Sequence, residues 1–470
     1  MTASDRFLNL WHPLSRGWMK LSRVASRFFM SRYFYLFLFC LASYMIISEN
    51  QVKGAILFIG IICLALVLCE DILCTTLPFL LMCVFVCQCY DSFDIFMGYA
   101  WIAIPALFSI LFHFIIYRKP IQIGSTFWGL IAVSAALILG GVGLISATDY
   151  FRPMTLYYTV FLSIGMVVAY LLLKSQMCVK RDYDVKEKFL SLLYITGMFT
   201  CVMVFHFTMS TWDYMKEIGA IPWWQPSNNT STFLMIALPC PFFFVPRNRA
   251  HLIAPFVMFL AIFLTGSRSG LILGAVELVL CLLLTASWDS ARRFLYVCLT
   301  VGIIGLALWK GEELLQAGGS FTWEGVMTRD ETRYLLLSRV KELFLANPIF
   351  GHGLGYSGNT DIYSPVKGAM EWYHMMIPQV VGSMGIFGVV AYVSQLVLQM
   401  RATVLPFRRL TAEQRGARMT LGLCYIGLLL MSQLNPGIFC PLPYTLIGTM
   451  IFALMDGNSG TAWLRKNKEK

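Results

Sequence analysis

Apolar runs of roughly 20 residues follow one another along most of this chain, and a run of that length spans a bilayer as an α-helix. The chain is 58% hydrophobic and 13% charged, with a mean hydropathy of +0.69. A soluble fold of this size cannot bury so much apolar surface. We therefore predict an all-α polytopic membrane protein with about 12–14 transmembrane helices. The predicted spans lie at 33–48, 54–69, 72–89, 95–117, 124–146, 155–173, 189–209, 229–246, 251–265, 269–286, 294–309, 376–400, 419–434 and 443–456.

The distribution of Lys and Arg predicts the orientation of these helices. Most of the 36 basic residues fall in short segments that all face the cytoplasm if the N-terminus does. A net charge of +11 scattered in this way forms no single basic patch, so we expect no nucleic-acid partner. The predicted organisation is a cytoplasmic basic amphipathic segment at 1–32, transmembrane helices at 33–309, a large extracytoplasmic loop at 310–375, transmembrane helices at 376–456 and a cytoplasmic tail at 457–470.

The first 32 residues do not resemble a cleaved signal peptide, because no small-residue cleavage site follows the first apolar run. Apolar residues recur there at helical spacing, with Arg16, Lys20 and Arg23 between them. This pattern predicts an interfacial helix on an anionic leaflet, and a disordered basic tail is the alternative. The apolar residues are Phe7, Leu10, Trp11, Leu14, Trp18 and Leu21.

The large loop has an internal pattern of its own. Residues 329–348 carry Leu336, Val340, Leu343 and Phe344 at helical spacing and end at Asn347-Pro348, which predicts an amphipathic helix. A glycine-rich turn follows, "GHGLG", with Gly351, Gly353 and Gly355. The next apolar segment then begins just after His374. We expect these parts to cover the outer end of a helix bundle.

Arginines on the predicted outer side are unusual, because basic residues favour the cytoplasmic side of a membrane protein. They are therefore candidates for a function, and their charge suits the binding of an anion. Arg268 lies in the short turn "TGSRSG" between two spans, and Arg333 lies on the loop helix. Both would suit a diphosphate, although snorkelling or a solvated helix face would also explain them. Arg329 and Arg152 are weaker candidates of the same kind.

His374 is the candidate general base, because an imidazole can accept a proton near neutral pH. An interfacial histidine that only satisfies a loop carbonyl is the alternative. His352 reads as structural or adjacent to substrate, and Glu277, in the middle of a span, as a functional carboxylate or a helix-to-helix contact. The 14 cysteines fall mostly in apolar runs, and no spacing indicates a disulfide framework or a metal site. We therefore expect chemistry without a metal or cofactor.

Together, "TGSRSG" and a later "R…NPIFGHGLG…H…GIFG" resemble the O-antigen ligase and polymerase superfamily of bacterial envelopes. The resemblance is tight over 263–390. The chain departs from the family pattern at Met375, where Asn is usual. The residues at motif positions are Arg333, Asn347, Pro348, Gly351, Gly353, Gly355, His374, Gly385 and Gly388.

This resemblance implies a multi-pass glycosyltransferase of the bacterial cytoplasmic (inner) membrane. Such an enzyme transfers glycan from an undecaprenyl-diphosphate carrier to an acceptor glycan or glycolipid, with inversion and without a metal. Arg268 and Arg333 would bind the diphosphate and His374 would be the base. Membrane lipid, and for a polymerase a chain-length regulator, would be further partners. The number of spans favours a polymerase over a ligase.

Two other classes of protein remain open from the residues alone. A transporter or lipid-linked glycan flippase needs polar residues near the middle of several spans, and only Glu277, His113 and His206 qualify. A non-catalytic scaffold for envelope synthesis would need none of the candidate residues.

Overall fold

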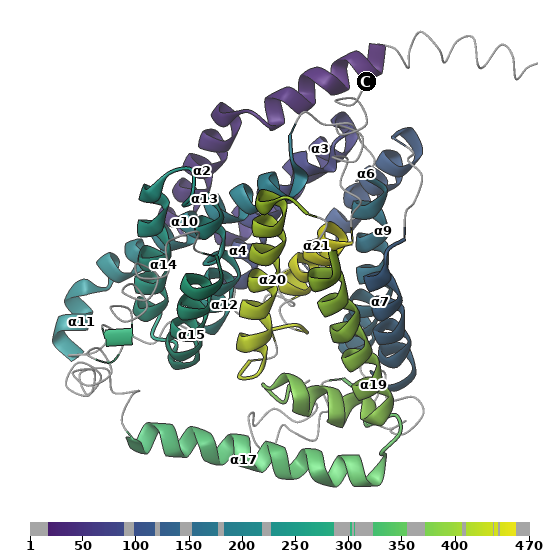
Figure 1. Ribbon diagram of the computed structural model, residues 1–470, viewed down its shortest axis with the longest axis vertical. Helices are drawn as coiled ribbons and strands as arrows, with labels where there is room; N and C mark the ends of the chain where they lie inside the picture. Colours follow the sequence, from purple (N-terminus) through teal and green to yellow (C-terminus); the bar gives the residue numbers. More distant parts are fainter. Residues whose placement is uncertain are drawn as a thin grey trace, which may run out of the picture. The chain divides into compact units, whose positions relative to one another are not determined.

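The computed structural model describes most of the chain as α-helices (Figure 1). For 323–333 the helical backbone is described but not the side chains. The described residues are 17–88, 98–117, 123–141, 153–176, 183–218, 227–285, 301–302, 305, 323–354, 372–406, 410–435, 437–439 and 442–456. The chain forms two compact units. Unit 1 comprises Met1–Ile121, Ser175–Phe199 and Ser459–Lys470, and unit 2 comprises Gln122–Lys174 and Thr200–Asn458.

Unit 1 contains the N-terminal helices and the first half of α10. The helix Gly17–Phe29 meets α2 at a bend of 59°, and the Ser31 side chain caps α2 by accepting from the Phe34 amide. Phe85 packs against Phe58 and Phe199 with ring centroids 5.5 Å and 6.1 Å apart, which ties α4 to α3 and α10. The elements are α2 (Arg32–Ile47), α3 (Gln51–Leu68), η1 (Ile72–Thr75), α4 (Thr76–Gln88), η2 (Ala100–Ile102), α6 (Ala103–Ile116) and α10 (Val185–Ser210).

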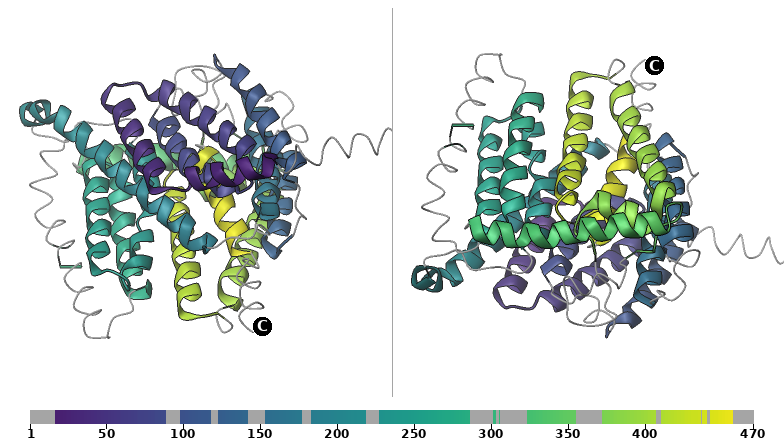
Figure 2. Two further views of the ribbon diagram at one scale, coloured as in Figure 1. Left: turned by 90° about the horizontal axis from the view of Figure 1, so that it is seen from above. Right: turned by 90° about the horizontal axis from the view of Figure 1, so that it is seen from below.

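Unit 2 contains the helices that carry the candidate residues. They are α7 (Ser125–Ala136), η3 (Leu137–Gly141), α8 (Pro153–Val160), η5 (Phe161–Gly165), α9 (Met166–Gln176), α11 (Trp212–Ile218), α12 (Ser227–Ala237), α13 (Cys240–Phe244), η6 (Arg249–Leu252), α14 (Ile253–Leu264), α15 (Arg268–Thr285), α17 (Trp323–Ala346), α19 (Met376–Val404), α20 (Ala412–Ser432) and α21 (Leu442–Met455). α17 lies across one end of this unit, below α15, α20 and α19 in the view of Figure 1, and Figure 2 shows the same crossing from below.

Each predicted span except 294–309 coincides with a helical segment, and 294–309 lies almost wholly outside the described residues. Several helices differ from their predicted extent, and three of the differences have a visible place in the sequence. The span at 229–246 is broken into α12 and α13 at Pro239, which has no amide hydrogen to donate. α20 begins at Ala412, because Thr411 and Gln414 form a capping box there. α17 begins at Trp323, before the predicted 329.

The described helices make this a multi-pass α-helical membrane protein, as the sequence predicts. By length and composition, four of them can cross a membrane: Gln51–Leu68, Thr155–Lys174, Val185–Ser210 and Met376–Val404. The bent pair Gly17–Phe29 and Arg32–Ile47 would make a fifth if it is one span. Shorter apolar helices lie at Ile72–Gln88, Ala100–Ile116, Ser125–Gly141, Arg249–Leu264 and Leu442–Met455.

Candidate functional site

The glycine-rich turn docks onto a break in α19. At Gly385 this helix leaves the helical conformation (φ 59°, ψ −153°), so neighbouring backbone groups lose their partners within the helix. The turn supplies replacements through four hydrogen bonds: His352 N to Gly382 O (2.9 Å), Gly353 N to Ser383 O (3.0 Å), Ile386 N to Pro348 O (2.8 Å) and Phe387 N to Ile349 O (3.2 Å). The turn is therefore fixed to the helix through backbone hydrogen bonds.

Glycine is required where the two backbones meet. Gly351 has a φ of 70°, and a Cβ there would collide with the backbone of Ser383 and Met384. A Cβ on Gly385 would lie 2.5 Å from the Pro348 carbonyl oxygen. Gly140 of η3 lies against the same turn from another direction, because a Cβ on Gly140 would collide with the Phe350 carbonyl. The turn thus lies between η3 and α19 at backbone-to-backbone distance.

The amphipathic helix α17 is held beside this turn by its apolar face. Leu336, Val340 and Leu343 are buried and pack with the buried ring of Tyr373. The helix is therefore confirmed, and three of its four predicted apolar positions are buried, while Phe344 is half-buried. Since Tyr373 directly precedes His374, the packing fixes the end of α17 next to the candidate base.

His374 has an unusual backbone conformation for its residue type. Its φ is 52°, in the left-handed region that non-glycine residues seldom occupy, and its side chain is partly exposed. The residues around it are locked: the Tyr373 amide donates to Gln379 Oε1 at 2.9 Å, and Gln379 Nε2 donates to Ser383 Oγ at 2.8 Å. Strain held in place by its surroundings is common at functional sites.

Arg268 begins α15 and lies on a similarly rigid turn. Gly266 has a φ of 73°, and Ser267 Oγ caps the helix by accepting from the Gly270 amide at 3.1 Å. Ser267 Oγ also donates to Asn228 Oδ1 of α12 at 2.8 Å, and Ser231 Oγ lies 2.8 Å from Thr265 Oγ1. The turn is thus anchored to α12 and presents the partly exposed Arg268 at a helix N-terminus, where anions are stabilised.

The chain that directly follows α20 links these two parts of unit 2. Gln433 Nε2 lies 3.5 Å from Met376 Sδ, two residues after His374. A Cβ on Gly437 would lie 3.7 Å from Thr232 Cγ2 on α12, the helix that anchors the Arg268 turn. His374 and Arg268 therefore occupy the same end of unit 2, the end that α17 crosses (Figure 1).

The remaining predicted site residues divide into two groups. Pro348, Gly351 and Gly353 form the docked turn. Arg152 and Gly355 lie outside the described residues, and the side chains of Arg329 and Arg333 are not described, although both residues lie on α17.

The sequence analysis missed Gln379, Ser383 and Gly140. Only the pair Gly140-Gly141 inside an apolar run gave a signal of close backbone approach.

His352 has a structural position at the end of α17. Asn347 Nδ2 lies 2.9 Å from its Nε2. Burial lowers the pKa of the imidazole, and hydrogen bonding to the Leu343 carbonyl opposes that shift without reversing it. A neutral ring can accept from Asn347, so His352 joins the last turn of α17 to the glycine turn.

Glu277 lies away from this end, in the core between α15 and α20. It is fully buried, and neither carboxyl oxygen has a hydrogen-bond partner among the described residues. A Cβ on Gly427 of α20 would collide with Oε1 and lie 2.8 Å from the carboxyl carbon. Glu277 therefore fills a space that a glycine of the neighbouring helix leaves.

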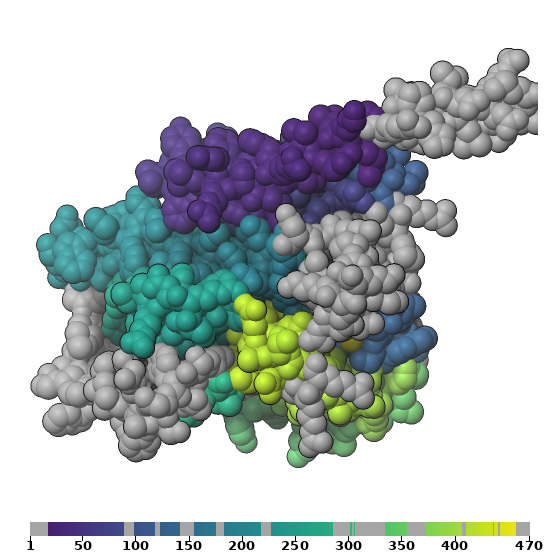
Figure 3. All heavy atoms as spheres, turned by 45° about the horizontal axis from the view of Figure 1, so that its top comes forward, coloured from purple at the N-terminus to yellow at the C-terminus, as the bar shows by residue number. Residues whose placement is uncertain are grey.

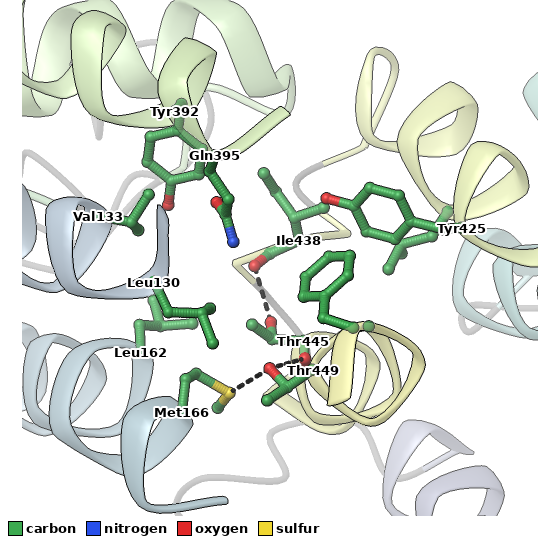
Figure 4. A pocket seen from close by; sticks show the side chains of 13 residues that line it. Leu130, Val133, Leu162, Met166, Tyr392, Gln395, Tyr425, Ile438, Thr445 and Thr449 are labelled. Carbon is green, nitrogen blue, oxygen red and sulfur yellow. Dashed lines mark hydrogen bonds between the residues drawn. The ribbon is translucent and has the colours of Figure 1, made fainter. Parts of the chain in front are cut away.

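The cavity in Figure 4 also lies away from His374, because its lining residues on α19, Tyr392 and Gln395, come about five to six turns later. Its volume of about 40 Å³ suits a few water molecules. Thr445 Oγ1 donates to the Ile438 carbonyl at 2.7 Å, and Thr449 Oγ1 to the Thr445 carbonyl at 2.9 Å. It is too small for a glycan and has no evident part in the chemistry.

Comparison with known proteins supports the resemblance seen in the motifs. Residues 253–393 match the family model described as O-antigen ligase, and this segment contains α14, α15, α17, the docked turn and the first part of α19. Over this segment the chain is therefore similar to the O-antigen ligases, a class of membrane glycosyltransferases. No curated protein and no solved structure matches it.

Proposed function

We propose that this protein transfers a glycan from an undecaprenyl-diphosphate carrier to an acceptor hydroxyl at the outer face of the bacterial cytoplasmic membrane. One observation carries the proposal: a partly exposed histidine in a strained conformation, His374, lies at the same end of unit 2 as Arg268, beside the docked turn. The family match supports the reaction type.

In the proposed reaction, His374 removes the proton from the acceptor hydroxyl as its oxygen attacks the anomeric carbon. The bond from that carbon to the carrier's diphosphate oxygen breaks, and undecaprenyl diphosphate leaves with the bonding electrons. Attack opposite the leaving group inverts the anomeric configuration. The strained backbone and the packing of Tyr373 hold the imidazole in one position, which lowers the entropy lost on reaching the transition state.

The leaving diphosphate gains negative charge, and fixed cations stabilise it. Arg268 supplies one from the rigid turn at the start of α15, and Arg333 on α17 is the proposed second. Arg329 and Arg152 are proposed as weaker contributors. In this scheme the arginines provide the charge compensation, and the reaction uses no metal or cofactor.

The two forms of this reaction differ only in the acceptor. A polymerase adds repeat units to a carrier-linked chain, with a regulator of chain length as a further partner, and a ligase moves a finished chain to a glycolipid. The many predicted spans favour the polymerase.

The test is deletion of the gene in its host and complementation with wild type, His374→Ala or Arg268→Gln at matched membrane levels. Carrier-linked and envelope glycans are then separated by size. We expect both variants to behave like the deletion, with transfer by His374→Ala reduced about 10²–10⁴-fold. Accumulated single repeats would identify a polymerase, and accumulated long chains a ligase.

His251→Gln is the matched control, because His251 lies in η6, at the opposite end of α14 from the Arg268 turn. It should restore wild-type glycan. If His374→Ala and Arg268→Gln also restore it, the proposed chemistry is wrong. Accumulation of carrier-linked units on the cytoplasmic face in the deletion would instead identify a flippase.

A further inference from the structure

A groove in unit 1 runs between α2 and α10. It has a volume of about 460 Å³, which is in the range of small-ligand sites. From α2 it is lined by positions that share one helix face, and from α10 by a matching set. The lining residues are Arg32, Tyr35, Leu36 and Phe39 on α2 and Tyr194, Ile195 and Met198 on α10. Apart from Arg32 and the tyrosine hydroxyls, the lining is apolar.

Two cations lie at one end of this groove. Arg32 is the first residue of α2 and is exposed, and it makes no hydrogen bond or ion pair with any described residue. Lys188 of α10 lies with its Nζ 4.6 Å from the centre of the Tyr35 ring. The two positive charges repel each other, while Asp71 and Glu187 attract Lys188. Arg32 therefore lies beside a like charge, without an ion-pair partner of its own among the described residues.

The bend before α2 indicates the depth of Arg32 in the membrane. The helix Gly17–Phe29 carries the exposed Lys20, Arg23 and Arg27, and α2 leaves it at 59°. A basic helix that turns into an apolar one is typical of a segment that lies on the bilayer surface and then enters the bilayer. The bend immediately before Arg32 thus places this residue at the level of the lipid headgroups. Figure 3 shows these N-terminal helices, in purple, exposed at the surface on the face in view.

We propose that this groove is a binding site for an anionic phospholipid. One acyl chain lies along Leu36, Phe39 and Ile195, and the phosphate lies between Arg32 and Lys188. The anion relieves the repulsion between the two cations, and the chain covers the apolar floor. The positive-inside pattern assigns this end to the cytoplasmic side, and the cytoplasmic leaflet carries anionic lipids. This site shares no residue with the proposed transferase site.

The test is native mass spectrometry of the full-length protein released from nanodiscs of phosphatidylglycerol or phosphatidylcholine with the same acyl chains. We expect phosphatidylglycerol to remain bound and phosphatidylcholine to be lost. Arg32→Gln should weaken retention about fivefold, and Arg32→Gln with Lys188→Gln about 25-fold. Arg32→Lys keeps the charge that directs membrane insertion and should keep most of the binding. Ile195→Trp should weaken binding of lipid with both charges intact, because the indole occupies the groove.

Lys20→Gln is the control, since it removes an exposed charge from the same basic region. If it weakens retention as much as Arg32→Gln, the lipid is held by overall charge and the proposed site is wrong. Equal retention of phosphatidylcholine would also overturn the proposal. Displacement of phosphatidylglycerol by undecaprenyl phosphate would overturn it too, because the groove would then be a site for a carrier lipid. A dimer that Ile195→Trp disrupts would show instead that the groove holds a second copy of the chain.

Discussion

Gly351 in the turn and Gly385 in α19 face each other across a backbone-to-backbone contact, and each has a positive φ, 70° and 59°. Each glycine clears the space that the other segment's backbone occupies. Four hydrogen bonds across this contact join a turn that follows α17 to a break in the helix that follows His374. Two segments more than 30 residues apart thereby form one rigid support for the candidate base.

Alanine at either glycine should therefore separate the turn from α19. Left-handed backbone costs an L-residue roughly 1–2 kcal/mol, and the added methyl group must also displace backbone atoms. We expect Gly351→Ala and Gly385→Ala to lose at least about tenfold in transfer activity and to speed amide exchange at residues 352–353 and 386–387. Gly60→Ala is the control, because nothing lies within 4 Å of its added Cβ. Unchanged exchange in both variants would contradict the docking described here.

Arg268 should act through its charge and its planar guanidinium, not through packing. Arg268→Gln is expected to lower kcat about 10²-fold, and Arg268→Lys less, because an ammonium keeps the charge but loses the two-pronged contact. Arg339→Gln on α17 is the control: the Arg339 guanidinium lies 3.9 Å from Glu342 of the same helix, and this change should not affect kcat. A fall in protein amount with unchanged kcat would show that Arg268 supports the fold instead.

The docked turn should loosen in mild acid through His352. Its pKa in the folded protein lies below the ordinary value of about 6.5, so folding favours the neutral ring. This contribution to stability is present in full above about pH 6.5 and is lost as pH falls through the lower folded value. We expect amide protection at 352–353, measured relative to the intrinsic exchange rate at each pH, to fall between pH 7.5 and 5, and His352→Phe to remove that dependence. The same pH dependence in His352→Phe would assign it to another group.

Glu277 and Gly427 should be coupled through the space they share. Gly427→Ala places a methyl group against the Glu277 carboxyl and is expected to destabilise the protein by about 1–3 kcal/mol. Glu277→Ala removes that obstacle, so the double variant should be more stable than the sum of the two single changes predicts. Glu277→Gln should keep transfer activity, because the carboxyl lies away from the proposed site. Loss of activity in Glu277→Gln at normal stability would give the carboxyl a functional role.

The sequence determined the class of structure and carried the motifs that resemble the O-antigen ligases. Apolar runs of roughly 20 residues satisfy their backbone hydrogen bonds in lipid as helices, so most of the helices could be predicted from the sequence. The loop helix could also be predicted, because Leu336, Val340 and Leu343 recur at the helical period. In the structure these three residues pack with Tyr373. The family motif depends on residue types in a fixed order, and the match over 253–393 agrees with it.

Only the tertiary structure decided what the glycines do. In the sequence, the apolar run around Gly385 looks like ordinary helix and gives no sign of the positive φ, because the partners of the freed backbone groups lie 30 to 38 residues earlier. The sequence likewise contains no sign that Gln379 holds the Tyr373 amide or that Ser267 binds Asn228. Local pattern sets which segments are helical, since that preference acts within a few residues. The positions of His374 and Arg268 depend on long-range backbone and side-chain contacts, which exist only once the helices have packed.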